Sequence, residues 1–396
     1  MRAIAIVSLI ITGSVMTFAQ SASKQTFGAN PNLPFSGAVK AGGLIYVAGS
    51  IGPASGELGK DIKTQTKQTL DNISATLTSA GSSMANVASM MVYLRNAADF
   101  AAMNEVYATY WPKDPPTRTT VVVTQPLALP DGLIEISAVA IPNGGERVVV
   151  HPPDWIKSPN PYSYGIKSGN TLFLAGLISR NGKDNTPIKG DMKVQTKTVL
   201  ENASTVLKAG GMTFADVVSA RVYVTDSGAF QDMNEVYRTY FPTDPPARAT
   251  VKATLNSNDY LVEITMVAVR GTKTAITTPT EDGKPGTKNP NLSSAIRVGN
   301  RLYLSGILGN TPANKGDVKG QAAETMARIG RTLKAAGFDW NHLVEGMVYL
   351  PDLTKFADMN ASYREPIAKD FPARATVGAG LMNADGAVEI MFTAVK

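Results

Sequence analysis

The feature that most constrains the fold of this 396-residue chain is a segment that occurs three times. Residues 232–251 read "DMNEVYRTYFPTDPPARATV", and close counterparts are "AMNEVYATYWPKDPPTRTTV" at 102–121 and "DMNASYREPIAKDFPARATV" at 358–377. Matching positions are 126–130 residues apart, whereas solenoid repeats have periods of about 20–50 residues. A unit of roughly 110 residues is long enough to bury its own core. The repeat therefore predicts three whole domains.

Each copy shows the same order of expected elements. In the first copy, two short apolar runs at 37–43 and 44–52 predict strands joined by a glycine-rich hairpin. An amphipathic helix is expected at 61–81, then a strand at 87–94 and a shorter helix. Two more strands follow, and the last of them is expected at 133–141. The order ββαβαββ predicts an α+β fold in which one sheet is covered on one face by both helices.

The face of each sheet that the helices leave uncovered predicts how the three domains assemble. Strands such as "SARVYV" carry apolar residues on both sides, so both faces must be covered. Three sheets that face one another would form a pseudo-trimer within one monomeric chain. Connectors rich in Pro, Gly and Thr at 141–160 and 270–291 separate the copies. The expected domains are 24–142, 156–270 and 288–396.

The first residues predict export. Residues 1–19 contain one arginine and an apolar run, and small residues follow, which is typical of a secretory signal peptide cleaved between Ala19 and Gln20. The alternative is an uncleaved membrane anchor, although the run is short for a span. The mature protein is expected in the periplasm or the medium, without membrane attachment.

Composition narrows the possible chemistry. The chain has no cysteine, which excludes disulfides, thiol nucleophiles and thiolate metal sites. Its two histidines, His151 and His342, fall at non-equivalent positions, so a repeated histidine site is excluded. The net charge of +6 comes from scattered lysines and arginines, whereas nucleic-acid binding needs a basic stripe and commonly aromatic platforms. No nucleic-acid partner is expected.

Three polar positions recur in every copy and are the candidate site residues. They are an asparagine, an arginine 14 residues later and a glutamate in the last strand: Asn104, Asn234 and Asn360; Arg118, Arg248 and Arg374; Glu135, Glu263 and Glu389. A charge in an apolar strand is costly unless it is paired or faces a wet cleft. One interpretation is a set of inter-domain salt bridges. The other is a substrate site, in which a guanidinium binds a carboxylate and a carboxylate handles a proton or water.

Within one copy the arginine and the glutamate are expected to lie apart. If the last two strands form a hairpin, Glu389 lies opposite a residue near Gly378 and several residues along from Arg374. The two side chains of a copy could instead line a cleft or meet a neighbouring domain.

All three copies resemble the RidA family of reactive-intermediate deaminases, also known as endoribonuclease L-PSP. The resemblance is carried by "DFPARATV" and "AVEIMFTAV" in the third copy, "DPPARATV" and "LVEITMVAV" in the second, and "DPPTRTTV" and "LIEISAVAI" in the first. It implies chorismate-mutase-like domains with sites in the clefts between them. The implied reaction hydrolyses 2-imino or enamine acids to 2-oxo acids and ammonia, without cofactor or metal.

The resemblance also implies roles for the recurring residues. The arginines would anchor the substrate carboxylate, the glutamates would handle water or a proton, and the asparagines would line the cleft. The family's tyrosine matches Tyr162 but is Phe35 and Leu292 elsewhere, and its serine matches Ser305 but is Ala48 and Ala175 elsewhere. One or two competent clefts are therefore expected. The alternatives are a non-catalytic module that binds small carboxylates or has a stress-related role and, from the older family name, a ribonuclease.

Overall fold

The computed structural model describes residues 24–30 and 32–396. The expected signal peptide and its cleavage site therefore lie outside the described residues. None of the helices within the described ranges is both long and apolar enough to cross a membrane.

The chain forms three α+β domains that share the predicted order ββαβαββ, each preceded by one further strand, and domain 3 also contains two short additional strands. Domain 1 comprises β1 (Gln25–Phe27), β2 (Ala38–Ala41), β3 (Leu44–Ser50), α1 (Ile62–Ser79), β4 (Val87–Leu94), α2 (Phe100–Tyr110), β5 (Thr117–Val122) and β6 (Ile134–Ala140). Domain 2 comprises β7 (Val148–Val150), β8 (Gly165–Ser168), β9 (Thr171–Leu174), α3 (Met192–Ala209), β10 (Val217–Val224), α4 (Phe230–Tyr240), β11 (Ala247–Lys252) and β12 (Val262–Val269). Domain 3 comprises β13 (Lys273–Ile276), β14 (Ala295–Val298), β15 (Arg301–Leu304), β16 (Ile307–Leu308), α5 (Val318–Ala335), β17 (Leu343–Leu350), α6 (Phe356–Arg364), β18 (Ala373–Gly378), β19 (Gly380–Leu381) and β20 (Glu389–Val395).

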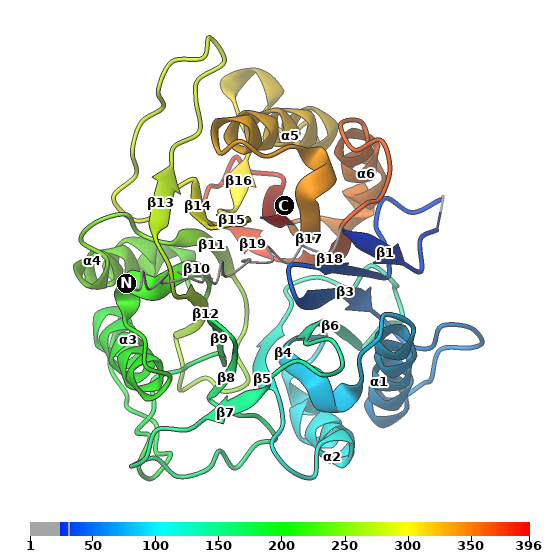
Figure 1. Ribbon diagram of the computed structural model, residues 1–396, viewed down its shortest axis with the longest axis vertical. Coiled ribbons are helices and arrows are strands. Elements are labelled where there is room, and N and C mark those ends of the chain that lie inside the picture. The colour runs from blue at the N-terminus through cyan, green and yellow to red at the C-terminus, as the bar shows by residue number, and fades with distance from the viewer. Residues whose placement is uncertain (1–23, 31) are drawn as a thin grey trace, which may run out of the picture.

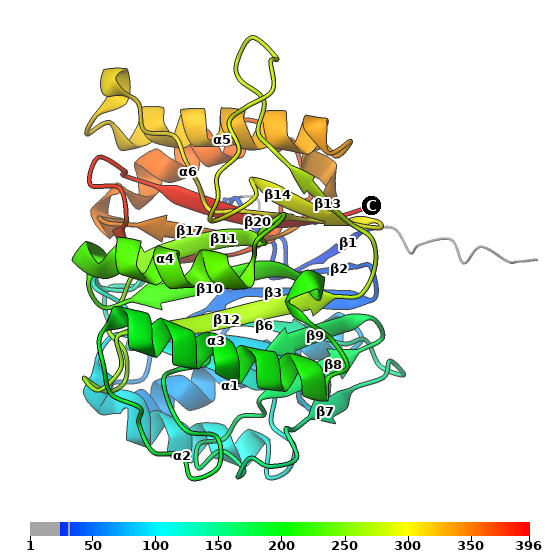
Figure 2. The same ribbon diagram turned by 90° about the vertical axis from the view of Figure 1, so that its left-hand side faces the viewer.

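The long helix of each domain starts at an aspartate and packs through one apolar face. Asp61, Asp191 and Asp317 each accept a hydrogen bond from the backbone N–H three residues later, which satisfies one of the free donors at the helix start. In α1 the buried face includes Ile62, Leu70 and other residues of the expected apolar stripe. The two helices of each domain lie outside its sheet (Figures 1 and 2).

The three sheets face one another around a common axis, which confirms the pseudo-trimer (Figure 1). Their inner faces share one apolar cluster to which all three domains contribute. At its centre the Tyr223 hydroxyl lies 3.4 Å from that of Tyr93 and 3.3 Å from that of Tyr349. The cluster explains why the strands are apolar on both faces.

The expected hairpin between the last two strands is wrong. In domain 3, β18 pairs with β17 in parallel, and β20 pairs with the opposite edge of β17, so that Glu389 lies opposite Tyr349. The reason is that α6 connects β17 to β18, and a helical crossover makes the two strands parallel. Domains 1 and 2 have the same arrangement.

The connectors also contain strands that their composition did not predict. β7 pairs with β8, and β13 pairs with β14, so each connector adds an edge strand to the domain that follows it. A further strand crosses between domains, because β19 of domain 3 pairs with β11 of domain 2.

Candidate functional site

The three arginines occupy equivalent places in the three domains. Each is the second residue of the strand that follows the shorter helix, namely β5, β11 or β18. These strands pair in parallel with β4, β10 and β17, and each arginine is 2–3% exposed. The guanidinium carbon lies over a tyrosine ring from the shorter helix: Arg118 over Tyr107 at 4.7 Å, Arg248 over Tyr237 at 4.6 Å, and Arg374 over Tyr363 at 4.6 Å. Burial lowers the pKa of all three arginines.

Each arginine lies near the glutamate of the next domain rather than that of its own. Glu263 interacts with Arg118, Glu389 with Arg248, and Glu135 with Arg374. In cleft 3/1, for example, the backbone N–H of Thr376 donates to Oε1 of Glu135 at 3.4 Å. We name the sites cleft 1/2 (Arg118 and Glu263), cleft 2/3 (Arg248 and Glu389) and cleft 3/1 (Arg374 and Glu135).

The glutamates are held as neutral acids. Each glutamate is buried, and burial raises its pKa to about 8, although the arginine and one backbone N–H oppose the shift. A low-dielectric site disfavours the charged form of a carboxyl group. At neutral pH each glutamate can therefore donate a proton or a hydrogen bond.

A glycine makes room for each glutamate. A Cβ at Gly49, Gly176 or Gly306 would overlap Oε1 of Glu135, Glu263 or Glu389, respectively. The backbone N–H of the glycine also joins the domains in clefts 1/2 and 2/3, where it donates to the carbonyl of Arg118 or Arg248 at 3.1 Å. Only glycine fits these positions without displacing the carboxyl group.

The clefts leave buried polar atoms without protein partners. Nε and Nη1 of all three arginines have no hydrogen-bond partner among the described residues, and Nη2 of Arg374 also lacks one. An unpaired buried donor costs about 1–3 kcal/mol, and more when it is charged. Direct salt bridges would satisfy these atoms, so the geometry favours a site that is completed by a ligand or water.

The three asparagines differ in their hydrogen-bond partners. Oδ1 of Asn234 accepts from Nη2 of Arg248 at 2.7 Å. Nδ2 of Asn104 instead donates to Oδ1 of Asn160 at 3.3 Å, and Oδ1 of Asn360 is buried without a partner in residues 24–30 and 32–396. Among the hydrogen bonds of these described residues, Asn234 is the one of the three that bonds directly to an arginine.

The clefts also differ at the positions of the tyrosine and the serine. Tyr162 lies in cleft 1/2, with its ring centre 6.0 Å from the guanidinium carbon of Arg118, and Phe35 takes this place in cleft 3/1 at 5.3 Å from Arg374. In cleft 2/3, Ser305 accepts from the backbone N–H of Arg248 at 2.8 Å and donates to Ser293 O at 2.6 Å. This serine hydroxyl thus forms hydrogen bonds that join domains 2 and 3.

Cleft 1/2 contains a cavity of about 230 Å³. Arg118 and Thr120 of domain 1 line it together with Tyr162, Gly176 and Glu263 of domain 2. A water molecule occupies roughly 30 Å³ of liquid, so this volume admits a small organic acid. Arginine, tyrosine and glutamic acid thus meet around a space of substrate size.

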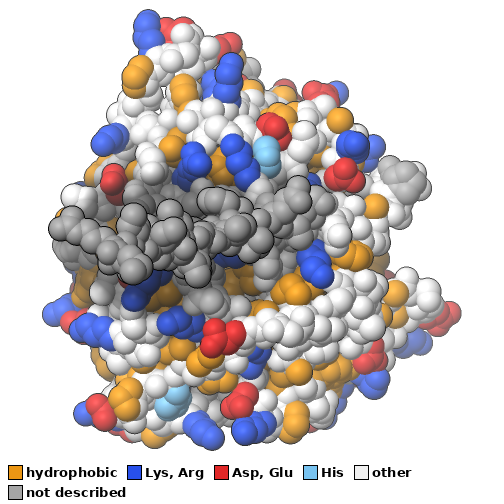
Figure 3. Space-filling model, in the orientation of Figure 1, with side chains coloured by type: hydrophobic (Ala, Val, Ile, Leu, Met, Phe, Trp, Pro, Cys, Tyr) orange, Lys and Arg blue, Asp and Glu red, His pale blue; other side chains and the backbone are white. Residues whose placement is uncertain are grey.

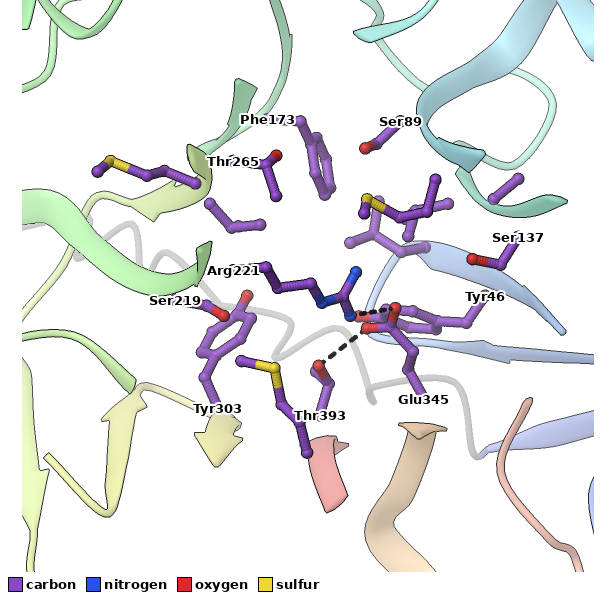
Figure 4. Close-up of a pocket in the computed structure, with 17 residues that line it drawn as sticks. Tyr46, Ser89, Ser137, Phe173, Ser219, Arg221, Thr265, Tyr303, Glu345 and Thr393 are labelled. Atoms are coloured by element: carbon purple, nitrogen blue, oxygen red, sulfur yellow. Dashed lines mark hydrogen bonds and ion pairs between the residues drawn. The ribbon is translucent and has the colours of Figure 1, made fainter. Parts of the chain in front are cut away.

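A second, smaller cavity of about 60 Å³ lies between the inner faces of the three sheets (Figure 4). Arg221 and Glu345 point toward each other there, with Nη2 and Oε1 2.9 Å apart, and Thr393 donates to the other oxygen of Glu345 at 3.1 Å (Figure 4). The repeat places Met91 and Met347 at the position of Arg221. Because the charges satisfy each other, we interpret this cavity as a domain junction.

Several site residues were missed by the sequence analysis although the repeat contains a signal for them. The glycine after the second strand, the tyrosine three residues after the asparagine, and the threonine two residues after the arginine are identical in all copies: Gly49, Gly176 and Gly306; Tyr107, Tyr237 and Tyr363; Thr120, Thr250 and Thr376. Cleft 1/2 also contains Arg180, which has no arginine counterpart in the other copies.

The face seen in Figure 3 shows lysines and arginines scattered among acidic and neutral side chains rather than gathered in a stripe. A basic groove of the kind that follows a nucleic-acid backbone is not visible on the described part of this face.

Comparison with known proteins gives a match for each domain. The family model described as endoribonuclease L-PSP matches residues 28–142, 154–270 and 285–396. A RutC family protein of Sulfurisphaera tokodaii is 43% identical over 115 residues, which cover 29% of this chain and 92% of that protein. Protein DfrA of Myxococcus xanthus is 37% identical over 125 residues, which cover 31% of this chain and 95% of that protein.

Solved structures match single domains. RidA from the Antarctic bacterium Psychrobacter sp. is 27% identical and covers 31% of this chain and 99% of its own, with a TM-score of 0.30. The YjgF gene product of E. coli is 27% identical and covers 31% of this chain and 98% of its own, also with a TM-score of 0.30. The family model matches more than half of the chain, so this protein belongs to the endoribonuclease L-PSP (RidA) family and contains three tandem copies of its domain.

Proposed function

We propose that the protein hydrolyses 2-imino and enamine acids to 2-oxo acids and ammonia in its inter-domain clefts. Family membership supports a role in imine deamination or a related small-molecule function. The observation that carries the finer proposal is the meeting of a buried arginine with free N–H groups and a protonated glutamic acid of the next domain. The same two groups meet in all three clefts.

The arginine supplies the binding step. Its free N–H groups suit the two oxygens of a carboxylate, and the tyrosine under the guanidinium holds its plane. The carbon of a C=N bond next to that carboxylate is already electrophilic. Positioning and proton transfer are therefore sufficient for hydrolysis.

The glutamic acid supplies the proton. It protonates the imine nitrogen, which makes the carbon more susceptible to water, and the resulting carboxylate is stabilised by the nearby arginine. Addition of water gives a tetrahedral carbinolamine. One proton of the added water returns to the glutamate, which becomes neutral again, and the other passes to nitrogen; cleavage of the C–N bond then releases ammonia and leaves the 2-oxo acid.

A test follows imine decay in the presence of the full chain. An amino-acid oxidase acting on alanine would generate 2-iminopropanoate, and the triple variant Arg118→Ala, Arg248→Ala and Arg374→Ala would be compared with wild type. Two charged hydrogen bonds are worth about 3 kcal/mol or more, so we expect a loss of at least roughly 100-fold. The half-buried Arg95, which donates to Pro130 O, gives the control Arg95→Ala.

A wild-type protein that does not accelerate decay would contradict deamination, as would a triple variant that is as active as wild type. The single variants identify the competent clefts. Cleft 1/2 is our first choice because it combines Tyr162 with the cavity.

A second candidate function is the binding of small carboxylates without turnover. It is favoured by the inequality of the clefts, since Asn234 occupies one nitrogen of Arg248 and no cleft combines the tyrosine with the serine. In that case the arginine variants would lose binding of pyruvate in calorimetry, and imine decay would be the same with and without the protein.

We also propose that residues 1–19 direct export and are removed. The support is the sequence pattern alone. N-terminal sequencing of the protein from its native cells would show Gln20 first, whereas an N-terminus at residue 1 or 2 would contradict cleavage.

A further inference from the structure

Cleft 1/2 contains a second arginine besides Arg118. Arg180 follows strand β9 by six residues and lines the same cavity as Arg118 and Glu263. It also lies close enough to Glu263 for its charge to favour ionisation of that carboxyl, although burial outweighs this effect. Two guanidinium groups and one neutral acid are therefore among the groups that line one small cavity.

Arg180 is held in place but is not neutralised. Its carbonyl accepts from Nδ2 of Asn202 at 2.8 Å, and its guanidinium carbon lies 5.9 Å from the ring centre of Tyr260. Nε is buried and has no hydrogen-bond partner in the described part of the chain. A fixed cation with a buried free donor is the arrangement that binds an anionic group.

This cation is specific to one cleft. Arg180 lies four residues after Gly176, and the positions four residues after Gly49 and Gly306 are Pro53 and Asn310. The residues that all three clefts share do not explain why cleft 1/2 has a second arginine. Arg180 therefore points to a ligand feature that only cleft 1/2 recognises.

The other polar groups that line the cavity are compatible with an anion. The carboxylate of Asp259 lines the cavity, but its Oδ1 is paired with Nζ of Lys189 at 3.0 Å. Asn256 and Ser257 also line the cavity and carry side-chain hydrogen-bond donors. The lining around Arg180 and Arg118 is thus rich in cationic and polar groups.

We propose that cleft 1/2 takes short dicarboxylic substrates, with Arg118 binding the carboxylate next to the C=N bond and Arg180 binding a second carboxylate on the side chain. The choice of substrate class rests on the proposed function, because an imine formed from an acidic amino acid carries these two groups. Arg180 is then a specificity residue, and Glu263 performs the proton transfer for either class of substrate.

A binding experiment tests the cation independently of catalysis. Isothermal titration would compare oxaloacetate, which has two carboxylates, with pyruvate, which has one, for the wild type, Arg180→Gln and the control Arg95→Gln. We expect wild type and the control to bind oxaloacetate at least about tenfold more tightly than pyruvate, and Arg180→Gln to reduce this ratio to about one. Equal affinities in wild type, or equal weakening of both ligands by Arg180→Gln, would overturn the proposal.

A kinetic experiment tests the substrate class. Amino-acid oxidases acting on aspartate or alanine would generate the two imines. In Arg180→Gln we expect kcat/KM for the dicarboxylic imine to fall at least about tenfold, mainly through KM, while that for the monocarboxylic imine changes less than about twofold. An equal fall for both would overturn the specificity role. A binding preference without hydrolysis of either imine would instead contradict the proposed function and support the dicarboxylate site.

Discussion

The protonated state of the cleft glutamates can be tested through protein stability. Glu389 is 3% exposed, and burial raises its pKa from 4.5 to about 8. Gln is nearly isosteric, keeps an oxygen that can accept the backbone hydrogen bond of Thr250, and does not titrate. Glu389→Gln therefore removes the titration with little change in packing.

The sign and size of the effect follow from proton linkage. Between pH 4.5 and 8 the unfolded chain has lost the Glu389 proton while the folded chain retains it, so the unfolded state binds one proton fewer. The free energy of unfolding then falls by about 1.4 kcal/mol per pH unit for this residue. From pH 5 to pH 7, Glu389→Gln is expected to gain up to about 2.7 kcal/mol relative to wild type.

Urea denaturation at pH 5, 6 and 7 measures this difference, with Glu57→Gln at an exposed position as the control. Infrared spectroscopy at pH 7 gives a second readout, because the carbonyl band of a protonated carboxyl should weaken in Glu389→Gln. If the stability difference between Glu389→Gln and wild type does not change with pH, or if it falls as pH rises, the carboxyl is not a neutral acid in the folded protein.

Two further substitutions test the packing of the clefts and of the axis. Gly176→Ala should displace the Glu263 carboxyl and reduce imine hydrolysis in cleft 1/2 while the fold is kept; circular dichroism and kinetics check this, and unchanged activity would contradict it. Arg221→Met leaves the partly buried Glu345 without its cation and should cost up to about 3 kcal/mol in urea denaturation. Adding Glu345→Ser should recover most of that loss; strictly additive losses would show that the pair does not act as a unit.

Much of the fold could be predicted because the same spacing of apolar and polar residues occurs in three copies of the repeat. The amphipathic spacing in 62–77 and the apolar alternation in 87–94 indicate their elements from local residues alone. The strand order could not be obtained in this way. Whether Glu389 lies beside β18 or across β17 depends on a helical crossover, which acts between segments far apart in sequence.

Polar residues in apolar strands indicated the site residues. This pattern did not predict which of these residues lie together in one cleft. Arg118 and Glu263 are 145 positions apart and meet only because domains 1 and 2 pack around the axis. Gly176 was missed because its role is to leave space, and the need for space becomes visible only beside Glu263. Arg180 could not be predicted in the same way, because it occurs in one copy, whereas the repeat indicates residues that are present in all three.

The proposed mechanism depends on the inter-domain arrangement, in which each site combines the arginine of one domain with the glutamate of the next. Imine hydrolysis in the background Arg248→Ala and Arg374→Ala, which leaves only cleft 1/2, tests it most directly. Adding Glu263→Gln should reduce the remaining activity to that of the triple arginine variant, and adding Glu135→Gln should leave it unchanged. The reverse result, in which Glu135→Gln removes the activity and Glu263→Gln does not, would contradict the inter-domain site.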